Sequence, residues 1–278
     1  MISSELRDVD YERISRLVYE QCGINLHDGK KELVKARLGK RLREGNFKSF
    51  GDYYRYVVTD DGTDELISMI DSLSTNLTYF FREESHFHTL RQIILPILKA
   101  PINGGPPAKL RIWSAGCSTG EEPYSLAMTV CESVNGASNN VRIMATDIST
   151  KVLGAAVRGI FHKDKLSNLS TVTLKKYFQM GSGKSEGYYR IKKEISGMIQ
   201  FLRFNLMETP PSSYRFDVIF CRNVMIYFDK ETQAALVNRF CQCLNGGGYL
   251  FIGHSESLTG LRHDFKYIEP SVYKKKGQ

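Results

Sequence analysis

The chain has 278 residues, of which 42% are hydrophobic, and it carries a formal net charge of +8. This length suits about two domains of ordinary size, and this apolar share excludes a disordered chain. The positive charge favours an anionic partner, which could be a nucleic acid, a membrane surface or an acidic protein, although a merely soluble basic protein has the same charge.

Residues 1–100 predict a small all-α domain with no clear strand. Four residues are candidate N-caps of helices, namely Asp10, Asp28, Ser49 and Thr63. Gly23 and Gly45 are expected to end the first two of these helices. A longer helix follows Arg82 and is expected to kink or end near Pro96.

Pro and Gly concentrate in the segment APINGGPPAK, residues 100–109, which is the best candidate for a domain boundary. Beyond it, expected strands alternate with expected helices. The strands are 110–115, 141–147, 198–206, 216–224 and 247–255, and the helices are 121–134, 149–159 and 230–244. This alternation predicts an α/β domain over residues 101–278, with a parallel sheet covered by helices on both faces.

Residues 159–200 interrupt the alternation. They contain KKYFQMGSGKSEGYYRIKKEI, which predicts two short strands about a Gly-rich turn. Together with residues 198–204, these strands are expected to form a small antiparallel sheet. A hairpin is expected at residues 265–276.

The stretch WSAGCSTGEEPYSLA, residues 113–127, joins the first expected strand to a helix. Gly116 and Gly120 would let a ligand approach the backbone, but neither the dinucleotide spacing G-x-G-x-x-G nor the P-loop ending G-K-[ST] is present. Glu121 and Glu122 would repel a pyrophosphate, whereas S-adenosylmethionine has no phosphate and carries two cationic groups. The turn therefore favours a methyl donor, although the two glutamates could serve only the helix dipole.

Polar residues also end the next three strands, namely Asp147, Asn205, Arg222 and Asn223. In an open parallel sheet, ligands bind beyond the carboxyl ends of the strands. An acid at the position of Asp147 suits the two ribose hydroxyls of a nucleoside, although such an aspartate is also often only a helix cap.

Six segments together resemble the chemotaxis receptor methyltransferases, the CheR family. They are SLSTNLTYFFRE, WSAGCSTGEEPYSLA, ATDIS, FNL, FDVIFCRNVMIYF and FIGHSESL. The resemblance spans about residues 10–275 and implies a Rossmann-like, S-adenosylmethionine-dependent methyltransferase domain over residues 101–278. It also implies an inserted antiparallel β-subdomain at 159–200 and a preceding all-α domain at 1–100. The implied reaction converts glutamate side chains of transmembrane chemoreceptors to methyl esters and releases S-adenosylhomocysteine, in receptor adaptation of chemotaxis-type signalling.

The resemblance, together with Gly116 from the first turn, gives a cofactor-binding set, namely Asn76, Thr78, Arg82, Gly116, Glu122, Asp147, Asn205, Leu206, Arg222 and Asn223. Glu122 is expected near the methionine end of the cofactor, although Glu121 stays open for that role. Asp147 is expected to hold the ribose hydroxyls. Asn205 and Leu206 are expected to flank the adenine. No metal is implied.

Arg82 and Tyr227 are the expected catalytic residues beside the transferring methyl group. A glutamate has an ordinary pKa of about 4.3, so it is ionised at neutral pH and the attacking carboxylate needs no general base. Arg82 would orient that carboxylate, and the Tyr227 hydroxyl would position the attacking oxygen or help to exclude water. Tyr227 could instead be a packed aromatic side chain, and Arg82 could only pair with Glu83 or Glu84.

The expected partners are the cytoplasmic methylation helices of transmembrane chemoreceptors. Residues 29–44, GKKELVKARLGKRLRE, hold seven Lys or Arg and two Glu, which would attract an acidic helix in a salt-dependent way. A solvated basic helix has the same composition. The β-subdomain could dock a receptor C-terminal pentapeptide through strand addition, with Arg190, Lys192 or Lys193 meeting an acidic group, or it could only brace the fold.

Two other function classes stay open. A cofactor-binding sensor that no longer methylates would lack Arg82 or Tyr227, yet both are present. A nucleic-acid methyltransferase would suit the positive charge, but the basic helix lacks aromatic residues and no Asn/Asp-Pro-Pro-Tyr motif follows the fourth strand. We therefore expect no nucleic-acid partner.

The remaining expectations concern the compartment and the assembly. The six cysteines, at positions 22, 117, 131, 221, 241 and 243, have no zinc-site spacing, and a disulfide framework is not expected in a chain of this size. The first residues lack the order of a secretory signal, and no apolar run approaches the roughly 18 residues of a membrane span. A reduced, cytoplasmic monomer without membrane insertion is therefore expected.

Overall fold

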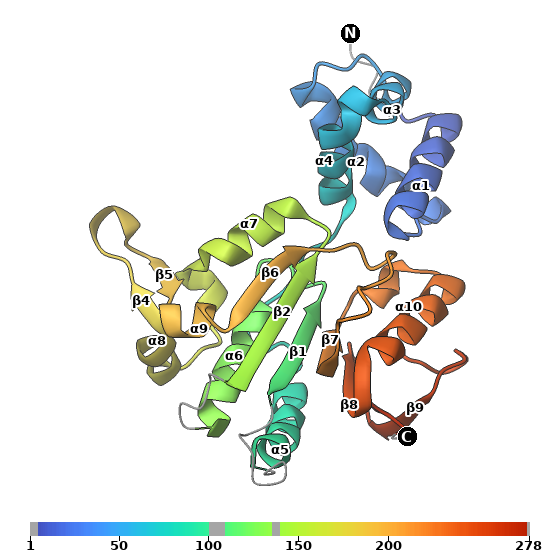
Figure 1. Cartoon of the computed structure of the whole chain (residues 1–278). Coiled ribbons are helices and arrows are strands. Elements are labelled where there is room, and N and C mark those ends of the chain that lie inside the picture. Colours follow the sequence, from blue (N-terminus) through green and yellow to red (C-terminus); the bar gives the residue numbers. More distant parts are fainter. Residues whose placement is uncertain (1–4, 100–108, 135–139, 277–278) are drawn as a thin grey trace.

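The computed structural model describes residues 5–99, 109–134 and 140–276, and it has two parts (Figure 1). The first part contains four helices, α1 (Asp8–Cys22), α2 (Lys31–Glu44), α3 (Phe50–Val57) and α4 (Thr63–Leu73). Their apolar faces form one buried cluster that includes Val18, Leu38, Tyr53 and Leu73. The predicted small all-α domain is confirmed.

The second part is a seven-stranded sheet with the order β6-β2-β1-β7-β8-β10-β9. Its strands are β1 (Leu110–Ala115), β2 (Val141–Asp147), β6 (Ile199–Arg203), β7 (Phe216–Cys221), β8 (Leu244–Ile252), β9 (Phe265–Glu269) and β10 (Val272–Lys275). The strands from β6 to β8 run parallel, and the hairpin β9–β10 closes the sheet in the antiparallel sense. The polar ends of β1, β2, β6 and β7 therefore meet at one edge of the sheet.

Helices cover both faces of this sheet. They are α5 (Glu84–Lys99), α6 (Glu121–Val134), α7 (Thr150–Arg158) and α10 (Lys230–Cys243). Successive β1 residues face opposite layers, because Ile112 packs in the cluster that contains α5 and α6, whereas Trp113 packs in the cluster that contains α10. This layering confirms the Rossmann-like α/β fold.

The small antiparallel sheet is confirmed, but one of its predicted strands is wrong. It has the order β3-β5-β4, with β3 (Ile160–His162), β4 (Phe178–Met180) and β5 (Tyr188–Ile191), and it lies beside α7 (Figure 1). Two short helices flank it, α8 (Thr171–Tyr177) and α9 (Lys193–Ser196). Residues 198–204 do not join it, since β6 pairs in parallel with β2 at the edge of the large sheet.

Some predicted helix ends are confirmed. Ser49 caps α3, because its Oγ accepts a hydrogen bond from the Asp52 amide at 3.1 Å. Gly23 ends α1 in the left-handed conformation with φ +72°, and Gly45 follows the last residue of α2. Pro96 does not end α5, which continues to Lys99.

Three predicted N-caps are wrong. Asp10 lies inside α1, which begins two residues earlier, and its buried carboxylate pairs with Arg7 at 2.8 Å. Asp28 opens a short 3₁₀ turn before α2, and Thr63 is the first residue of α4 rather than its cap. Both α2 and α4 follow directly on a 3₁₀ turn.

The apolar contacts place α5 with the sheet rather than with α1 to α4. Phe87, Leu90 and Ile94 of α5 belong to the same buried cluster as Ile112 and Phe220 of the strands. The proposed domain boundary in residues 100–108 lies outside the described residues, and the division at residue 100 stays a prediction.

The described residues contain neither a disulfide nor a candidate membrane span. All six cysteines are free. Among the helices within residues 5–99, 109–134 and 140–276, none is both long enough and apolar enough to cross a bilayer.

The turn before α4 should depend on the absence of a side chain at Gly62. A Cβ there would lie 2.0 Å from the backbone oxygen of Tyr56, so the Gly62→Ala substitution must displace backbone. We expect this variant to lower the free energy of unfolding by about 2 kcal/mol or more. Gly39→Ala is the matched control in α2, because only the Arg43 side chain is nearby, at 3.7 Å, and it should stabilise the helix by roughly 0.5–1 kcal/mol. Equal denaturation midpoints for the two variants would contradict this prediction.

Candidate functional site

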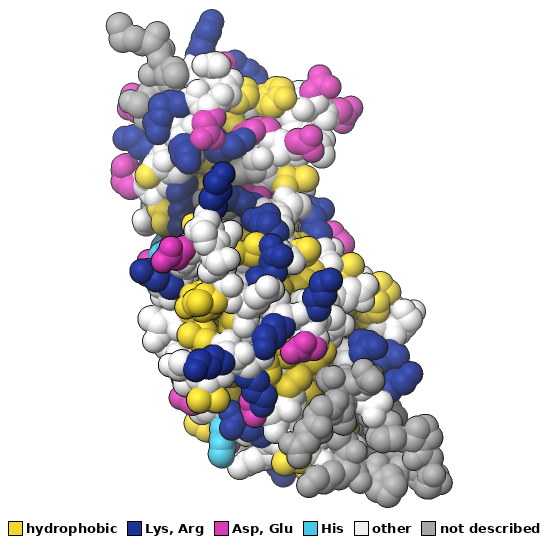
Figure 2. All heavy atoms as spheres, turned by 90° about the vertical axis from the view of Figure 1, so that its left-hand side faces the viewer, with side chains coloured by type: hydrophobic (Ala, Val, Ile, Leu, Met, Phe, Trp, Pro, Cys, Tyr) yellow, Lys and Arg dark blue, Asp and Glu magenta, His cyan; other side chains and the backbone are white. Residues whose placement is uncertain are grey.

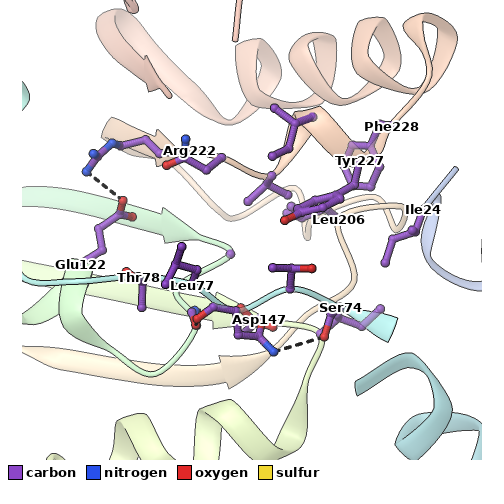
Figure 3. A pocket seen from close by; sticks show the side chains of 18 of the residues that line it. Ile24, Ser74, Leu77, Thr78, Glu122, Asp147, Leu206, Arg222, Tyr227 and Phe228 are labelled. Carbon is purple, nitrogen blue, oxygen red and sulfur yellow. Dashed lines mark hydrogen bonds and ion pairs between the residues drawn. The ribbon is translucent and has the colours of Figure 1, made fainter. Parts of the chain in front are cut away.

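A cavity of about 320 Å³ lies beyond the carboxyl ends of β1, β2, β6 and β7 (Figure 3). Every residue predicted to belong to the site lines it, namely Asn76, Thr78, Arg82, Gly116, Glu122, Asp147, Asn205, Leu206, Arg222, Asn223 and Tyr227. The structure therefore brings the whole predicted set to one place. The individual roles of these residues in binding and catalysis stay predictions.

The first turn is tight because Gly116 adopts φ +84° and lies against the loop after β7. A Cβ at Gly116 would lie 2.4 Å from Cγ2 of Val224. The Gly116 amide donates to the Thr146 carbonyl of β2 at 2.8 Å. The absence of a side chain thus lets three strand ends converge on the cavity.

Asp147 is fixed at the end of β2 by backbone donors. Its Oδ2 accepts from the Ser118 amide at 2.8 Å, and its Oδ1 accepts from the Ser149 amide at 3.0 Å. Burial raises the pKa of Asp147, and the backbone hydrogen bonds act in the opposite direction. Each carboxylate oxygen keeps further acceptor capacity, which suits a pair of hydroxyl donors.

The structure distinguishes Glu122 from Glu121, the two candidates for the position near the methionine end of the cofactor. Glu122 lines the cavity and accepts from Ser114 Oγ at 2.7 Å and from Arg222 Nη1 at 3.2 Å. Burial raises the pKa of Glu122, and the Arg222 cation offsets part of this effect. Glu121 does not line the cavity, because its buried carboxylate pairs with Lys165 at 2.9 Å.

Arg222 is the most connected side chain of the site. Besides Glu122, its guanidinium contacts Oε2 of Glu83 at 3.0 Å through Nη2 and donates to the Arg82 carbonyl. Its carbon Cζ lies 5.7 Å from the centre of the Phe87 ring. Burial alone would raise the pKa of Glu83, but the Arg222 cation and hydrogen bonds from its neighbours lower it overall.

The structure also adds residues that the sequence analysis missed or misassigned. Glu83 pairs with Arg222 rather than with Arg82, whose guanidinium instead donates to the Leu77 carbonyl at 2.9 Å. Buried Glu256 accepts from the Asn223 amide at 2.9 Å and thereby holds Asn223 at φ +58°. Its place in the segment FIGHSESL, which carries the resemblance, was the available signal.

The helical part contributes directly to the cavity wall. Cys22 and Ile24 line it, and the Asn25 amide donates to the Tyr227 carbonyl at 2.8 Å. The Tyr227 ring packs against the apolar cluster of α1 to α4, as the packed-aromatic alternative requires, yet it also faces the cavity. Figure 3 shows this ring across the cavity from Asp147.

Asn205 also connects the two parts of the molecule. Its Nδ2 donates to the Gln21 carbonyl at 2.7 Å, and its Oδ1 accepts from the Met207 amide at 3.0 Å. The side-chain amide of Asn205 is thus already engaged on both sides.

Behind Arg222, a second cluster brings together Glu83, His86 and His254. Their potential ligand atoms lie within 4.8 Å of one another, a spacing that a metal ion could bridge. Both oxygens of Glu83 already accept hydrogen bonds, and the adjacent Arg222 cation repels a second positive charge. The cluster is therefore poorly suited to a metal ion.

His86 is 1% exposed, and neither ring nitrogen has a hydrogen-bond partner among the described residues. Its Nδ1 lies 3.5 Å from Oε2 of Glu83. Burial, and then the Arg222 cation, lower the pKa of His86 to about 3. The imidazole is therefore neutral near pH 7.

Comparisons with known proteins agree with this geometry. The family described as "CheR methyltransferase, SAM binding domain" matches residues 76–274, and "CheR methyltransferase, all-alpha domain" matches residues 9–74. A "Chemotaxis protein methyltransferase" of Borreliella burgdorferi is 42% identical over 269 residues, which cover 96% of this chain and 94% of the relative. Proteins of the same name from Escherichia coli and Salmonella typhimurium are each 40% identical, over 96% of this chain and 91% and 90% of their own lengths.

The neutral state of His86 should make stability depend on pH. Between pH about 6.5 and 3 the unfolded chain binds a proton at this residue that the folded chain does not bind. The free energy of unfolding should therefore fall with decreasing pH, by up to about 1.4 kcal/mol per pH unit from this residue. Denaturant titrations from pH 7 to pH 5 should show a shallower pH dependence for His86→Gln than for wild type. The exposed neighbour His88 gives the control His88→Gln, which should keep the wild-type slope. Parallel curves for wild type and His86→Gln would refute this assignment.

Proposed function

The chain belongs to the CheR methyltransferase family and is an S-adenosylmethionine-dependent methyltransferase, and on this premise we propose that it methylates glutamate side chains of chemoreceptors. The products would be glutamate methyl esters and S-adenosylhomocysteine. The observation that carries the proposal is the single cavity in which Glu122, Asp147, Arg222, Arg82 and Tyr227 converge. The names of the relatives, "Chemotaxis protein methyltransferase", support the same pathway.

The charges of the cavity suit the methyl donor. An amino acid end carries an ammonium and a carboxylate, and the Glu122–Arg222 pair offers one opposite charge to each. Asp147 would accept both ribose hydroxyls with the acceptor capacity that its backbone donors leave free. Leu206 and the backbone near Asn205 would flank the adenine, since the Asn205 amide group is already engaged. When bound, the donor supplies an electrophilic methyl group.

The acceptor side of the cavity suits a carboxylate. Arg82 is half-buried, and its contact with the Leu77 carbonyl uses one of its five N–H donors. The remaining donors could hold a glutamate carboxylate in line with the methyl group. Within the described part of the chain the Tyr227 hydroxyl has no hydrogen-bond partner, so this group could contact the attacking oxygen. Because glutamate is ionised at neutral pH, neither residue needs to remove a proton.

The basic helix α2 has fewer free charges than its composition indicates. Arg41 pairs with Glu65, Arg37 donates to the Leu73 carbonyl, and Lys31 pairs with Asp8. Lys40 is exposed but lies 3.8 Å from a carboxylate oxygen of Glu44, and Arg43 is exposed. Figure 2 shows more Lys and Arg than Asp and Glu side chains on the face that carries the small sheet, which favours an acidic partner there.

We further propose that the small sheet accepts a receptor C-terminal peptide by strand addition. A groove on it is lined by residues of all three strands, including Ile160, Met180, Tyr188 and Arg190. Met180 is 70% exposed, and Arg190 could meet an acidic group. Lys192 is less suited, because its Nζ donates to the carbonyls of Lys175 and Lys176.

Replacement of Asp147 should weaken binding of the donor and its product. In Asp147→Asn one oxygen becomes an amide nitrogen that no longer accepts a hydroxyl, and hydrogen bonds to a charged group contribute about 1.5–3 kcal/mol. We expect the Kd for S-adenosylhomocysteine, measured by calorimetry, to rise about 10- to 100-fold. Asp164→Asn is the matched control, because this exposed carboxylate pairs only with His162 in the described structure, and its Kd should match wild type. Unchanged affinity in Asp147→Asn would remove the ribose assignment.

The reaction itself is tested with a purified receptor cytoplasmic fragment and methyl-labelled S-adenosylmethionine. We expect label on the fragment that mild alkali releases as methanol, since esters hydrolyse whereas methylated amines do not. Tyr227→Phe should lower kcat by about tenfold or more while leaving the Kd for S-adenosylhomocysteine within about threefold. Tyr267→Phe, at a 58% exposed position, is the control. Alkali-stable label would contradict the glutamate ester, and an unchanged kcat in Tyr227→Phe would remove its catalytic role.

A further inference from the structure

Three large apolar side chains lie exposed at the mouth of the cavity. Leu77 is 75% exposed, and Tyr79 and Ile226 are each 48% exposed, yet all three line the cavity. We call these three side chains the mouth rim. Single exposed apolar residues are common, but apolar side chains from two separate segments around one opening are typical of a binding surface.

The mouth rim and the catalytic arginine form one unit. The Arg82 guanidinium donates to the Leu77 carbonyl at 2.9 Å, and its carbon Cζ lies 5.8 Å from the centre of the Tyr79 ring. Ile226 directly precedes Tyr227. Figure 3 shows Leu77 and Thr78 on the segment that crosses the cavity. A ligand whose carboxylate contacts Arg82 therefore lies near the apolar side chains of Leu77 and Tyr79.

The basic helix α2 adjoins this same segment. Arg37 donates to the Leu73 and Ser74 carbonyls at 2.7 and 3.0 Å, and to Thr75 Oγ1 at 3.1 Å. Arg37 thus connects α2 to the residues that directly precede the mouth rim. The basic composition of α2 and the apolar rim together suit an acidic helix with an apolar stripe.

We propose that the mouth rim seats apolar side chains that lie one helical turn from the acceptor glutamate on a receptor helix. Residues three and four positions apart share one face of a helix, and one turn advances about 5.4 Å. When the glutamate enters the cavity, its neighbours on that face meet the rim. The rim therefore selects among receptor glutamates by the apolar character of those neighbours. This proposal rests on the proposed function and identifies how its substrate is chosen.

The test measures initial methylation rates against the concentration of a receptor cytoplasmic fragment for four forms of the protein. These are wild type, Leu77→Ser, Leu77→Met and the control Val172→Ser, whose side chain is 74% exposed on α8. Loss of the apolar contact should raise the KM for the fragment about five- to tenfold in Leu77→Ser. Leu77→Met keeps an apolar side chain and should stay within about twofold of wild type, as should Val172→Ser.

Calorimetry with S-adenosylhomocysteine on the same four proteins separates the possible causes. We expect the four Kd values to agree within about twofold. A wild-type KM in Leu77→Ser would overturn the proposal, and so would a KM increase matched by an equal loss of S-adenosylhomocysteine affinity. If wild type forms no ester on the fragment, the proposed function itself is wrong, and the proposal for the mouth rim then has no substrate. If wild type forms the ester, the KM values of the variants for the fragment test the mouth-rim proposal alone.

Discussion

The site depends on the buried guanidinium of Arg222. A charge removed from water is strongly unfavourable unless it is paired and hydrogen-bonded, and Arg222 meets this condition with two carboxylates and a backbone carbonyl. Its partners come from the segment at residues 82–83 and from the start of α6, whereas Arg222 itself follows β7. The planar fork of arginine fixes these three segments about one point. The cavity walls are therefore set by electrostatics as well as by the sheet.

Glu122 and Glu83 share this cation, which lowers the pKa of both, yet their pKa values move in opposite directions because burial outweighs the cation only at Glu122. Burial raises the pKa of Glu122, whereas the pKa of Glu83 is lowered by Arg222 and its other donors in spite of burial. The geometry separates their positions, since Glu122 lines the cavity whereas Glu83 does not line it and pairs with Arg222 at 3.0 Å. Glu256 acts similarly on the next residue, since it holds the Asn223 backbone in an unusual conformation.

Much of the fold and the polar strand ends of the site could be predicted because local sequence encodes them, whereas Asn76, Thr78, Arg82, Leu206 and Tyr227 were predicted only through the family resemblance. Strands buried on both faces read as apolar runs, and polar residues at their carboxyl ends identify the binding edge. The resemblance favoured Glu122, but residue patterns alone left Glu121 open, since the choice depends on how α6 is rotated against β1. The Glu83–Arg222 pair joins residues 139 positions apart, which no local pattern reveals. The strand Ile160–His162 is too short for any periodicity to show.

Calorimetric titration of S-adenosylhomocysteine into Arg222→Lys and wild type tests most directly whether Arg222 organises the cavity. Lysine keeps the charge but cannot bridge two carboxylates and a carbonyl, so the walls of the cavity should lose their common anchor. With helical content unchanged by circular dichroism, we predict at least a tenfold loss of affinity, while the exposed control Arg215→Lys matches wild type. Wild-type affinity in a folded Arg222→Lys variant would contradict the view that this cation organises the site.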